Sequence, residues 1–224
     1  MSAPPAFVSW SSGKDSAFAL HEARRSGLAE IVGVLTTINE TFDRVAMHGV
    51  RNELLDRQIA ALGVPAIKVP LPYPCPNAVY EARMAAAVAR IRAKGVRHIV
   101  FGDLFLADIR AYREEKLAAA GIHGLFPLWR RDTAALARDM IASGMVAHLV
   151  CIDPKQLDRS FAGRRFDQDL LAALPAGCDP CGENGEFHTV VSAGPMFSAP
   201  IPVTIGAIVE RDGFVFADAM PGEG

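Results

Sequence analysis

The chain has 224 residues, of which 50% are hydrophobic and 21% are charged, so it can bury a large core and wholesale disorder is excluded. Its 23 basic and 25 acidic residues give a formal net charge of −2, which argues against nucleic acid or an anionic membrane as a partner. No apolar run approaches the roughly 18 residues of a membrane span, and the N-terminus lacks a basic region followed by an apolar core, so we expect a cytoplasmic protein with no membrane partner.

The first predicted element is a short apolar strand, Phe7 to Trp10, which leads through Ser11-Ser12-Gly13-Lys14-Asp15-Ser16 into a helix over 17–26. The first turn of a helix leaves backbone N–H groups unpaired and carries partial positive charge, so such a junction binds phosphate oxygens. Within it we expect Gly13 to allow close approach of a ligand, Ser11 and Ser16 to donate hydroxyls, and Lys14 to supply a cation.

Asp15 does not fit a pure phosphate cradle. A carboxylate beside a phosphate indicates either Mg²⁺ ligation or an N-cap. The stretch is not the common P-loop, because G-x-x-x-x-G-K-[ST] cannot be laid over it. It fits the pattern S-x-G-x-D-S instead.

Strands and helices then alternate, which predicts a parallel sheet with helices on both faces. The expected strands are 31–37, 66–69 and 96–101, and the expected helices are 50–62, 78–94 and 109–120. Gly102-Asp103 follows the third of these strands, at the edge where such sheets bind ligands, although a turn with a helix cap is the alternative interpretation.

The second half begins with a compact apolar segment, 124–129, and a helix capped by Asp132-Thr133. A buried strand is expected over 145–152, an exposed charged loop over 153–166 and a short helix over 166–174. Strands at 190–191, 201–209 and 214–219 follow, the last two joined as a hairpin through Glu210 to Gly213.

A polar loop, Cys178-Asp-Pro-Cys-Gly-Glu-Asn-Gly-Glu-Phe-His-Thr189, carries the second candidate chemistry. A zinc site built on Cys178, Cys181 and His188 is disfavoured, because a structural site needs four ligands and the other cysteines lie far off. A thioredoxin-like role is disfavoured because the pair does not precede a helix in a βαβ unit.

Together these motifs resemble one family. Ser11 to Ser16 resembles the loop of the PP-loop ATP pyrophosphatases, and the chain is similar to the diphthine-ammonia ligase branch through Gly102-Asp-Leu104, Arg110 with Glu114, Pro127-Leu-Trp129, and Cys181 to Thr189. The resemblance implies an α/β fold, a Rossmann-like parallel sheet of the adenine nucleotide α-hydrolase type, plus a smaller C-terminal α+β domain. We expect an ATP-binding domain over 1–128 and a substrate-binding domain over 129–224.

The implied reaction uses ATP and Mg²⁺ to adenylate the carboxylate of diphthine, a modified histidine on elongation factor 2, after which ammonium displaces AMP. The resemblance assigns the phosphates to the Ser11–Ser16 loop, which includes Ser12, Gly13 and Lys14, and the metal or pyrophosphate to Asp15. It puts Gly102 and Asp103 beside the nucleotide, and Glu183 and Glu186 at the acceptor site. Lys14, Asp15, Glu183 and Glu186 are thus the expected catalytic residues.

Some positions depart from the family's pattern: Ser12 stands where many PP-loops have glycine, and Asn184, His188 and Met47-His48-Gly49 differ from the eukaryotic form. These departures leave the acceptor open, whereas the nucleotide chemistry is implied by the intact Ser11–Ser16 pattern. A PP-loop enzyme that adenylates a tRNA base or a small metabolite, and a nucleotide-binding protein without turnover, are the competing interpretations.

Overall fold

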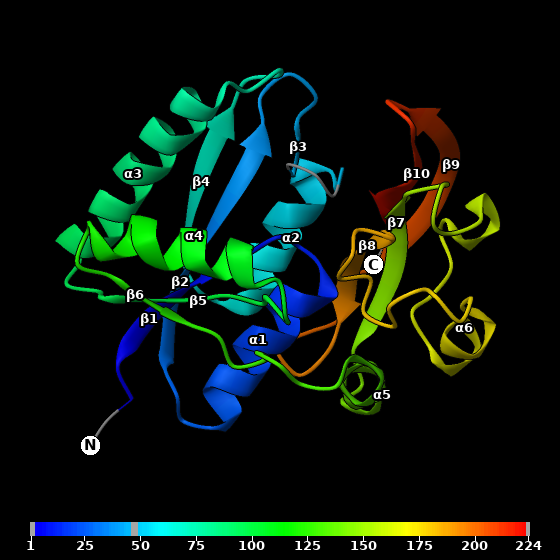
Figure 1. The fold of residues 1–224 in the computed structure, drawn as a ribbon, viewed down its shortest axis with the longest axis horizontal. Helices are drawn as coiled ribbons and strands as arrows, with labels where there is room; N and C mark the ends of the chain where they lie inside the picture. Colours follow the sequence, from blue (N-terminus) through cyan, green and yellow to red (C-terminus); the bar gives the residue numbers. More distant parts are fainter. Residues whose placement is uncertain (1–2, 46–48, 223–224) are drawn as a thin grey trace.

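The computed structural model describes residues 3–45 and 49–222. Met47 and His48, two of the positions that depart from the family pattern, lie outside the described residues. Two sheets lie side by side, a mostly parallel one from the first half of the chain and an antiparallel one from the second half (Figure 1).

The first sheet confirms the expected parallel α/β arrangement. Its parallel strands follow one another across the sheet in the order β4, β2, β1, β5, β6, and a short β3 pairs antiparallel with the end of β2. The strands are β1 (Pro5–Ser9), β2 (Glu30–Asn39), β3 (Arg44–Val45), β4 (Ala66–Leu71), β5 (His98–Val100) and β6 (His123–Leu125).

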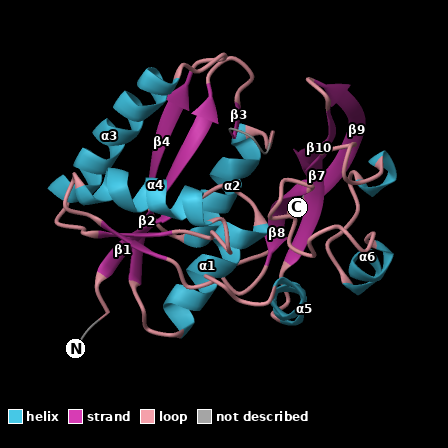
Figure 2. Ribbon diagram, viewed as in Figure 1, coloured by secondary structure: helices cyan, strands magenta, loops and turns pink. Residues whose placement is uncertain are grey.

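Helices cover both faces of this sheet (Figure 2), because successive strand side chains point to opposite faces. In β1, Ala6 and Val8 pack in one buried cluster with α1 and α2, whereas Phe7 packs in another with α3 and α4. The four helices are α1 (Lys14–Arg25), α2 (Asn52–Leu62), α3 (Asn77–Ala93) and α4 (Ala107–Ala118).

The second sheet is antiparallel, with strand order β8, β7, β10, β9, and it confirms the smaller α+β part of the predicted fold. Buried residues of β7 and β8 belong to the same hydrophobic cluster as α1 and α2, so one core joins the two halves. The elements are α5 (Thr133–Ala142), β7 (Val146–Ile152), a 3₁₀ turn η1 (Arg159–Phe161), α6 (Gln168–Ala173), β8 (Phe187–Ala193), β9 (Val203–Arg211) and β10 (Phe214–Pro221).

Three features differ from expectation. The stretch 153–166 is not simply an exposed loop, because Leu157, Phe161 and Phe166 are buried against the second sheet and anchor it. The apolar segment 124–129 contributes Gly124 and Leu125 to β6, a three-residue strand too short to show a period of its own. The first helix also begins at Lys14, three residues earlier than expected, because Gly13 is its N-cap.

Candidate active site

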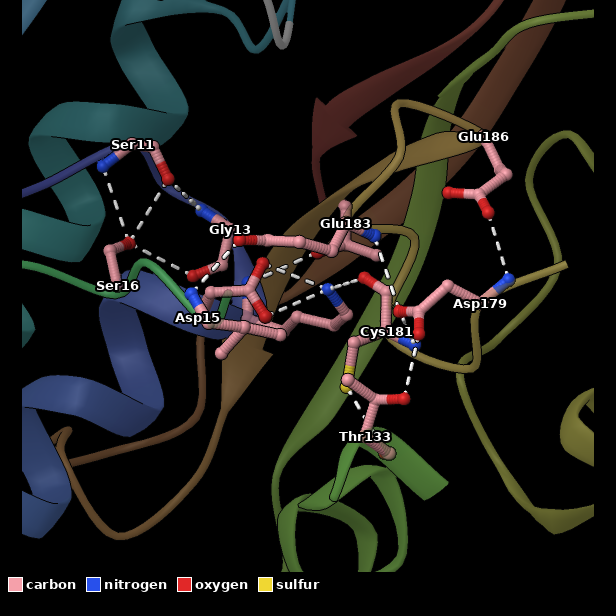
Figure 3. A network of polar contacts seen from close by, with 12 residues as sticks. Ser11, Gly13, Asp15, Ser16, Thr133, Asp179, Cys181, Glu183 and Glu186 are labelled. Carbon is pink, nitrogen blue, oxygen red and sulfur yellow. Dashed lines mark hydrogen bonds and ion pairs between the residues drawn. The ribbon is translucent and has the colours of Figure 1, made fainter. Parts of the chain in front are cut away.

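The Ser11–Ser16 loop joins β1 to α1 at the carboxyl edge of the parallel sheet. Gly13 is the N-cap and offers no side chain to the first-turn N–H groups. The N–H of Lys14 donates to Thr189 Oγ1 at 3.0 Å, so an anion would meet the N–H groups that follow it in the turn. The two serine hydroxyls face each other, with 3.1 Å between Ser11 Oγ and Ser16 Oγ, and Ser16 Oγ donates to the Gly13 carbonyl at 3.0 Å (Figure 3). The predicted sequence of strand, tight loop and helix is therefore present, and hydrogen bonds between residues of the loop give it a defined shape.

Ser12 holds the turn of this loop in a left-handed conformation, with φ of 69°. It is fully buried, and its hydroxyl has no hydrogen-bond partner among the described residues. Its carbonyl accepts from Val191 N at 2.9 Å and from Gln58 Nε2 at 3.2 Å. The backbone of the loop is thus fixed by groups outside it.

Gln58 was missed by the sequence analysis. It is fully buried on α2, donates to the carbonyls of Ser12 and Val191, and accepts from Trp10 Nε1 at 3.1 Å. The sequence feature that could have identified it is its place on the apolar face of a helix, in line with Leu54, Leu55 and Leu62. Gln58 ties α2 and β8 to the loop.

We expect replacement of Ser12 by Gly to raise the free energy of unfolding by about 1 kcal/mol, because glycine adopts positive φ without strain and the unpartnered hydroxyl disappears. Urea unfolding of the wild type and the variant measures the difference. Ser26→Gly, at a C-cap in the right-handed region, is the control and should not stabilise. Equal or lower stability of Ser12→Gly would contradict the expectation.

Gly102 lies directly against this loop. A Cβ at this position would come within 2.6 Å of the Asp15 carbonyl carbon and 2.8 Å of Ser16 N, so only glycine lets the end of β5 approach the first turn of α1. Its neighbour Asp103 is mostly buried, and this burial raises the pKa of the Asp103 carboxyl. The Arg113 guanidinium, with its Nε 3.0 Å from Asp103 Oδ2, partly offsets that increase. The Ser11–Ser16 loop and the Gly102-Asp103 segment therefore lie in contact at the carboxyl edge of the sheet.

Lys14 occupies a different place from the one its motif suggests. Its side chain is buried, at 2% exposure, and its ammonium donates to both Asp15 carboxylate oxygens, at 2.9 and 2.8 Å, and to the Cys181 carbonyl. It also lies 5.4 Å from the centre of the Phe187 ring. Lys14 thus links the Ser11–Ser16 loop to the polar loop over 178–189.

The last motif is a tight loop built around Glu186. One oxygen of this carboxylate accepts from Asp179 N at 2.8 Å, the other accepts from Asn184 N at 2.9 Å, and the residue is 1% exposed. Figure 3 shows Glu186 bonded to Asp179, at the opposite end of the polar network from Ser11 and Ser16. These contacts favour a structural part for Glu186 in place of the predicted catalytic one, which stays an untested prediction.

We expect Glu186→Gln to lower the free energy of unfolding by about 1–3 kcal/mol, because an amide NH₂ would face a backbone donor in a buried place. Thermal unfolding measures the loss. Glu40→Gln, which removes a carboxylate from the surface ion pair with Arg83, is the matched control and should change little. An unchanged melting temperature for Glu186→Gln, with amide formation abolished, would restore a catalytic role.

Glu183 points the other way, toward the Ser11–Ser16 loop. Its Oε1 accepts from Leu104 N at 2.9 Å, which joins the loop of the last motif to the end of β5. Burial raises the pKa of this carboxyl to about 7, and the Asp15 carboxylate adds to the rise. A carboxyl that titrates near neutrality and faces a cavity is suited to accept a proton.

Two adjoining cavities open at this edge. The smaller, about 220 Å³, is lined by both motifs and holds Ser11, Asp15, Ser16, Gly102, Asp103 and Glu183. The larger, about 790 Å³, extends between the ends of β2 and β4 and the β9–β10 hairpin, and is mostly apolar. Both are lined by Ser9, Ser11, Phe101, Arg113 and His188, which form the neck between them.

The cysteines near the site are free thiols. Burial raises the pKa of Cys181 to about 12 and that of Cys178 to about 11, so neither is a ready thiolate at neutral pH. Within 3–45 and 49–222, no group of three or more His, Cys, Asp or Glu side chains is placed to hold a metal ion by itself.

The remaining motif residues form a stack beside the neck. Arg110 lies 4.4 Å from the Phe126 ring centre and 4.7 Å from that of Trp129, and pairs with Glu114 at 2.8 Å. The expected ion pair is therefore present, and the aromatic contacts add a reason for the Pro127-Leu-Trp129 motif. These residues support α4 and do not line either cavity.

This arrangement defines the class: an α/β protein with helices on both faces of a mostly parallel sheet, a second antiparallel sheet, and a strand–loop–helix junction at the carboxyl edge of the parallel sheet. Comparison with known proteins narrows it. Residues 5–122 match the model of the diphthamide synthase N-terminal domain, and residues 132–215 match that of the diphthamide synthase C-terminal domain. The chain belongs to the diphthamide synthase family.

Two curated relatives carry the name diphthine–ammonia ligase. The protein of Schizosaccharomyces pombe is 35% identical over 95 residues, which make up 41% of this chain and 16% of the relative. The protein of Danio rerio is 32% identical over 119 residues, 50% of this chain and 46% of the relative. The chain thus matches less than half the length of either relative. No helix in the described part of the chain is long and apolar enough to cross a membrane.

Proposed function

We propose that the protein is a cytoplasmic ATP-dependent ligase that adenylates a carboxylate and amidates it with ammonium, releasing AMP and pyrophosphate. The acceptor we propose is diphthine on elongation factor 2, in keeping with the name of both relatives. The observation that carries the proposal is the meeting of three distant motifs, Ser11 to Ser16, Gly102-Asp103 and Glu183, around one cavity.

The two joined cavities suit a nucleotide. The smaller one has the first turn of α1, two serine hydroxyls and the close approach at Gly102, which together fit a pyrophosphate group. The larger one is apolar and large enough for a nucleoside together with part of an acceptor. ATP laid across the neck would hold its α-phosphorus between them.

The residues present also fit Mg²⁺. This ion keeps several waters and is usually bound by one or two carboxylates together with substrate phosphates, so it needs no preformed cluster of protein ligands. Asp15 lines the smaller cavity, keeps 28% of its side chain exposed and carries the oxygen donors that Mg²⁺ prefers. When bound, the ion would neutralise charge on the phosphate oxygens.

Two chemical steps follow. An oxygen of the acceptor carboxylate attacks the α-phosphorus, and the bond to the pyrophosphate oxygen breaks. Ammonium then gives one proton to Glu183, the ammonia attacks the acyl carbon, and AMP leaves as the amide forms, with the second proton released to water. The second step, the attack of ammonia, needs a base that is partly ionised at neutral pH, and Glu183 with its raised pKa is such a base.

The test is to mix the purified protein with Mg-ATP, ammonium and diphthine-bearing elongation factor 2, and to identify the products. We expect AMP and pyrophosphate in amounts that depend on both ammonium and the elongation factor, with one amide formed for each AMP. Release of AMP without that dependence would replace the acceptor by a tRNA base or a small metabolite. Formation of ADP, or no product, would reject the ligase function.

A further inference from the structure

Arg113 lies at the neck between the two cavities, where its contacts engage only part of its guanidinium. Its Nε pairs with Asp103, 3.0 Å from Oδ2 and 3.3 Å from Oδ1, and its guanidinium lies 4.8 Å from the centre of the Phe101 ring. Among the described residues, no partner engages its two terminal Nη groups. A guanidinium fixed through Nε and one face presents those two donors in a rigid fork.

Within the described part of the chain, the charged side chains that line the smaller cavity are acidic except for Arg113. Three carboxylates line it, those of Asp15, Asp103 and Glu183. Of the described residues in this lining, Arg113 is the one with a permanent positive charge, since burial lowers the pKa of His188 and leaves that ring mostly neutral at pH 7. The ammonium of Lys14 is turned to Asp15 and Cys181 and does not line either cavity.

The position of Arg113 along the site indicates which phosphate it meets. It lines both cavities, whereas Asp15, Ser16 and Gly102 line only the smaller one. A nucleotide whose nucleoside fills the larger cavity and whose pyrophosphate lies on the first turn of α1 has its α-phosphate at this neck. The other polar side chains there, those of Ser9, Ser11 and His188, supply hydrogen bonds but no fixed charge.

We propose that Arg113 is a catalytic residue that binds the α-phosphate of ATP through its Nη groups and stabilises the negative charge that develops there as pyrophosphate leaves. This assignment rests on the proposed adenylation reaction. The sequence motif predicts that Lys14 supplies the positive charge that binds phosphate. In this assignment the charge comes from Arg113 on α4, almost one hundred residues further along the chain. Asp103 and Phe101 then act as positioning residues for the guanidinium.

Calorimetric titration with a series of ligands tests the assignment without any acceptor. The ligands are adenosine, AMP, Mg-ATP and Mg-pyrophosphate, each titrated into the wild type and Arg113→Gln. We expect the variant to bind AMP and Mg-ATP about 10- to 100-fold more weakly, and adenosine and pyrophosphate with unchanged affinity, since a hydrogen bond to a charged group accounts for that range. Arg113→Lys should show a smaller loss, because it keeps the charge and loses the fork.

The controls separate a local role from a structural one. Arg90→Gln, which changes an exposed arginine in the last turn of α3, should leave all four affinities unchanged. An equal loss of adenosine and AMP binding in Arg113→Gln would show that Arg113 only supports the fold of the cavity, and would overturn the proposal. So would a loss confined to pyrophosphate. If the wild type bound none of the nucleotides, the proposed function itself would fail before any variant was compared.

Discussion

Replacing Glu183 by Gln is expected to slow amide formation by about 10²- to 10⁴-fold while the protein stays folded and still binds ATP, because general-base catalysis contributes a factor of that size. Gln is a close substitute here, since its amide oxygen can still accept the bond from Leu104 N that Glu183 Oε1 now receives. Adenylation needs no proton transfer to this residue. We therefore expect exchange of labelled pyrophosphate into ATP to continue in the variant while amide formation is lost.

The pH dependence gives a second measurement on Glu183. The pKa of the Glu183 carboxyl is raised from its ordinary value of 4.5 to about 7 in the folded protein, chiefly by burial. Between those values the folded state binds more protons than the unfolded state, so this carboxyl lowers stability as pH rises from about 4.5 to about 7, and the penalty is complete above the folded value. Unfolding in urea at pH 8 should therefore find Glu183→Gln more stable than the wild type, with the advantage shrinking toward pH 4.5.

The rate of amide formation at saturating acceptor should rise with pH through about 7 in the wild type, as Glu183 loses its proton, and this rise should vanish in the variant. Glu186→Gln provides the matched comparison within the same loop, because it alters a buried carboxylate that is bonded to backbone N–H groups and does not itself line the cavity. A normal rate of amide formation in Glu183→Gln would exclude Glu183 as the base.

Local patterns along the chain predicted most of the fold. The alternation of helical and strand periods predicted the parallel sheet, and glycines marked the helix ends: Gly63, for example, closes α2 in a left-handed conformation with φ of 68°. The short strands were the weak point. β6 has three residues and β3 has two, and neither length can display alternation, so only pairing with a neighbour identifies them.

The candidate site was predictable in its motifs but not in the direction of its side chains. Lys14 lies in the right loop, yet its ammonium contacts Cys181, 167 residues away, and no pattern local to the loop contains that contact. Arg113 carried no motif signal of its own, because it follows Arg110 by three residues in a helix rich in charge. Burial and charge pairing across distant segments decide such roles, and these are properties of the folded chain.

The buried position of Lys14 leads to the second large effect, on stability. Burial alone lowers the pKa of its ammonium, but the Asp15 carboxylate and nearby polar groups outweigh this effect, so the net pKa is raised above 10.5. A group with a raised folded pKa contributes its full stabilisation at any pH below its unfolded value and loses it as pH rises through the folded one. At neutral pH the whole contribution of Lys14 is present.

Replacing Lys14 by Met is therefore expected to lower the free energy of unfolding at pH 7 by about 2–4 kcal/mol, even without any ligand, because the Cys181 carbonyl is left unpaired and Asp15 loses its counter-charge. Met fills most of the same volume between Phe166 and Phe187, so little of the loss comes from a cavity. Urea unfolding of the ligand-free protein measures it, and Lys155→Met, in an exposed loop, should change stability by less than about 0.5 kcal/mol. A Lys14→Met variant as stable as the wild type, with only its ATP affinity reduced, would return Lys14 to the role of a phosphate ligand and weaken the case for Arg113.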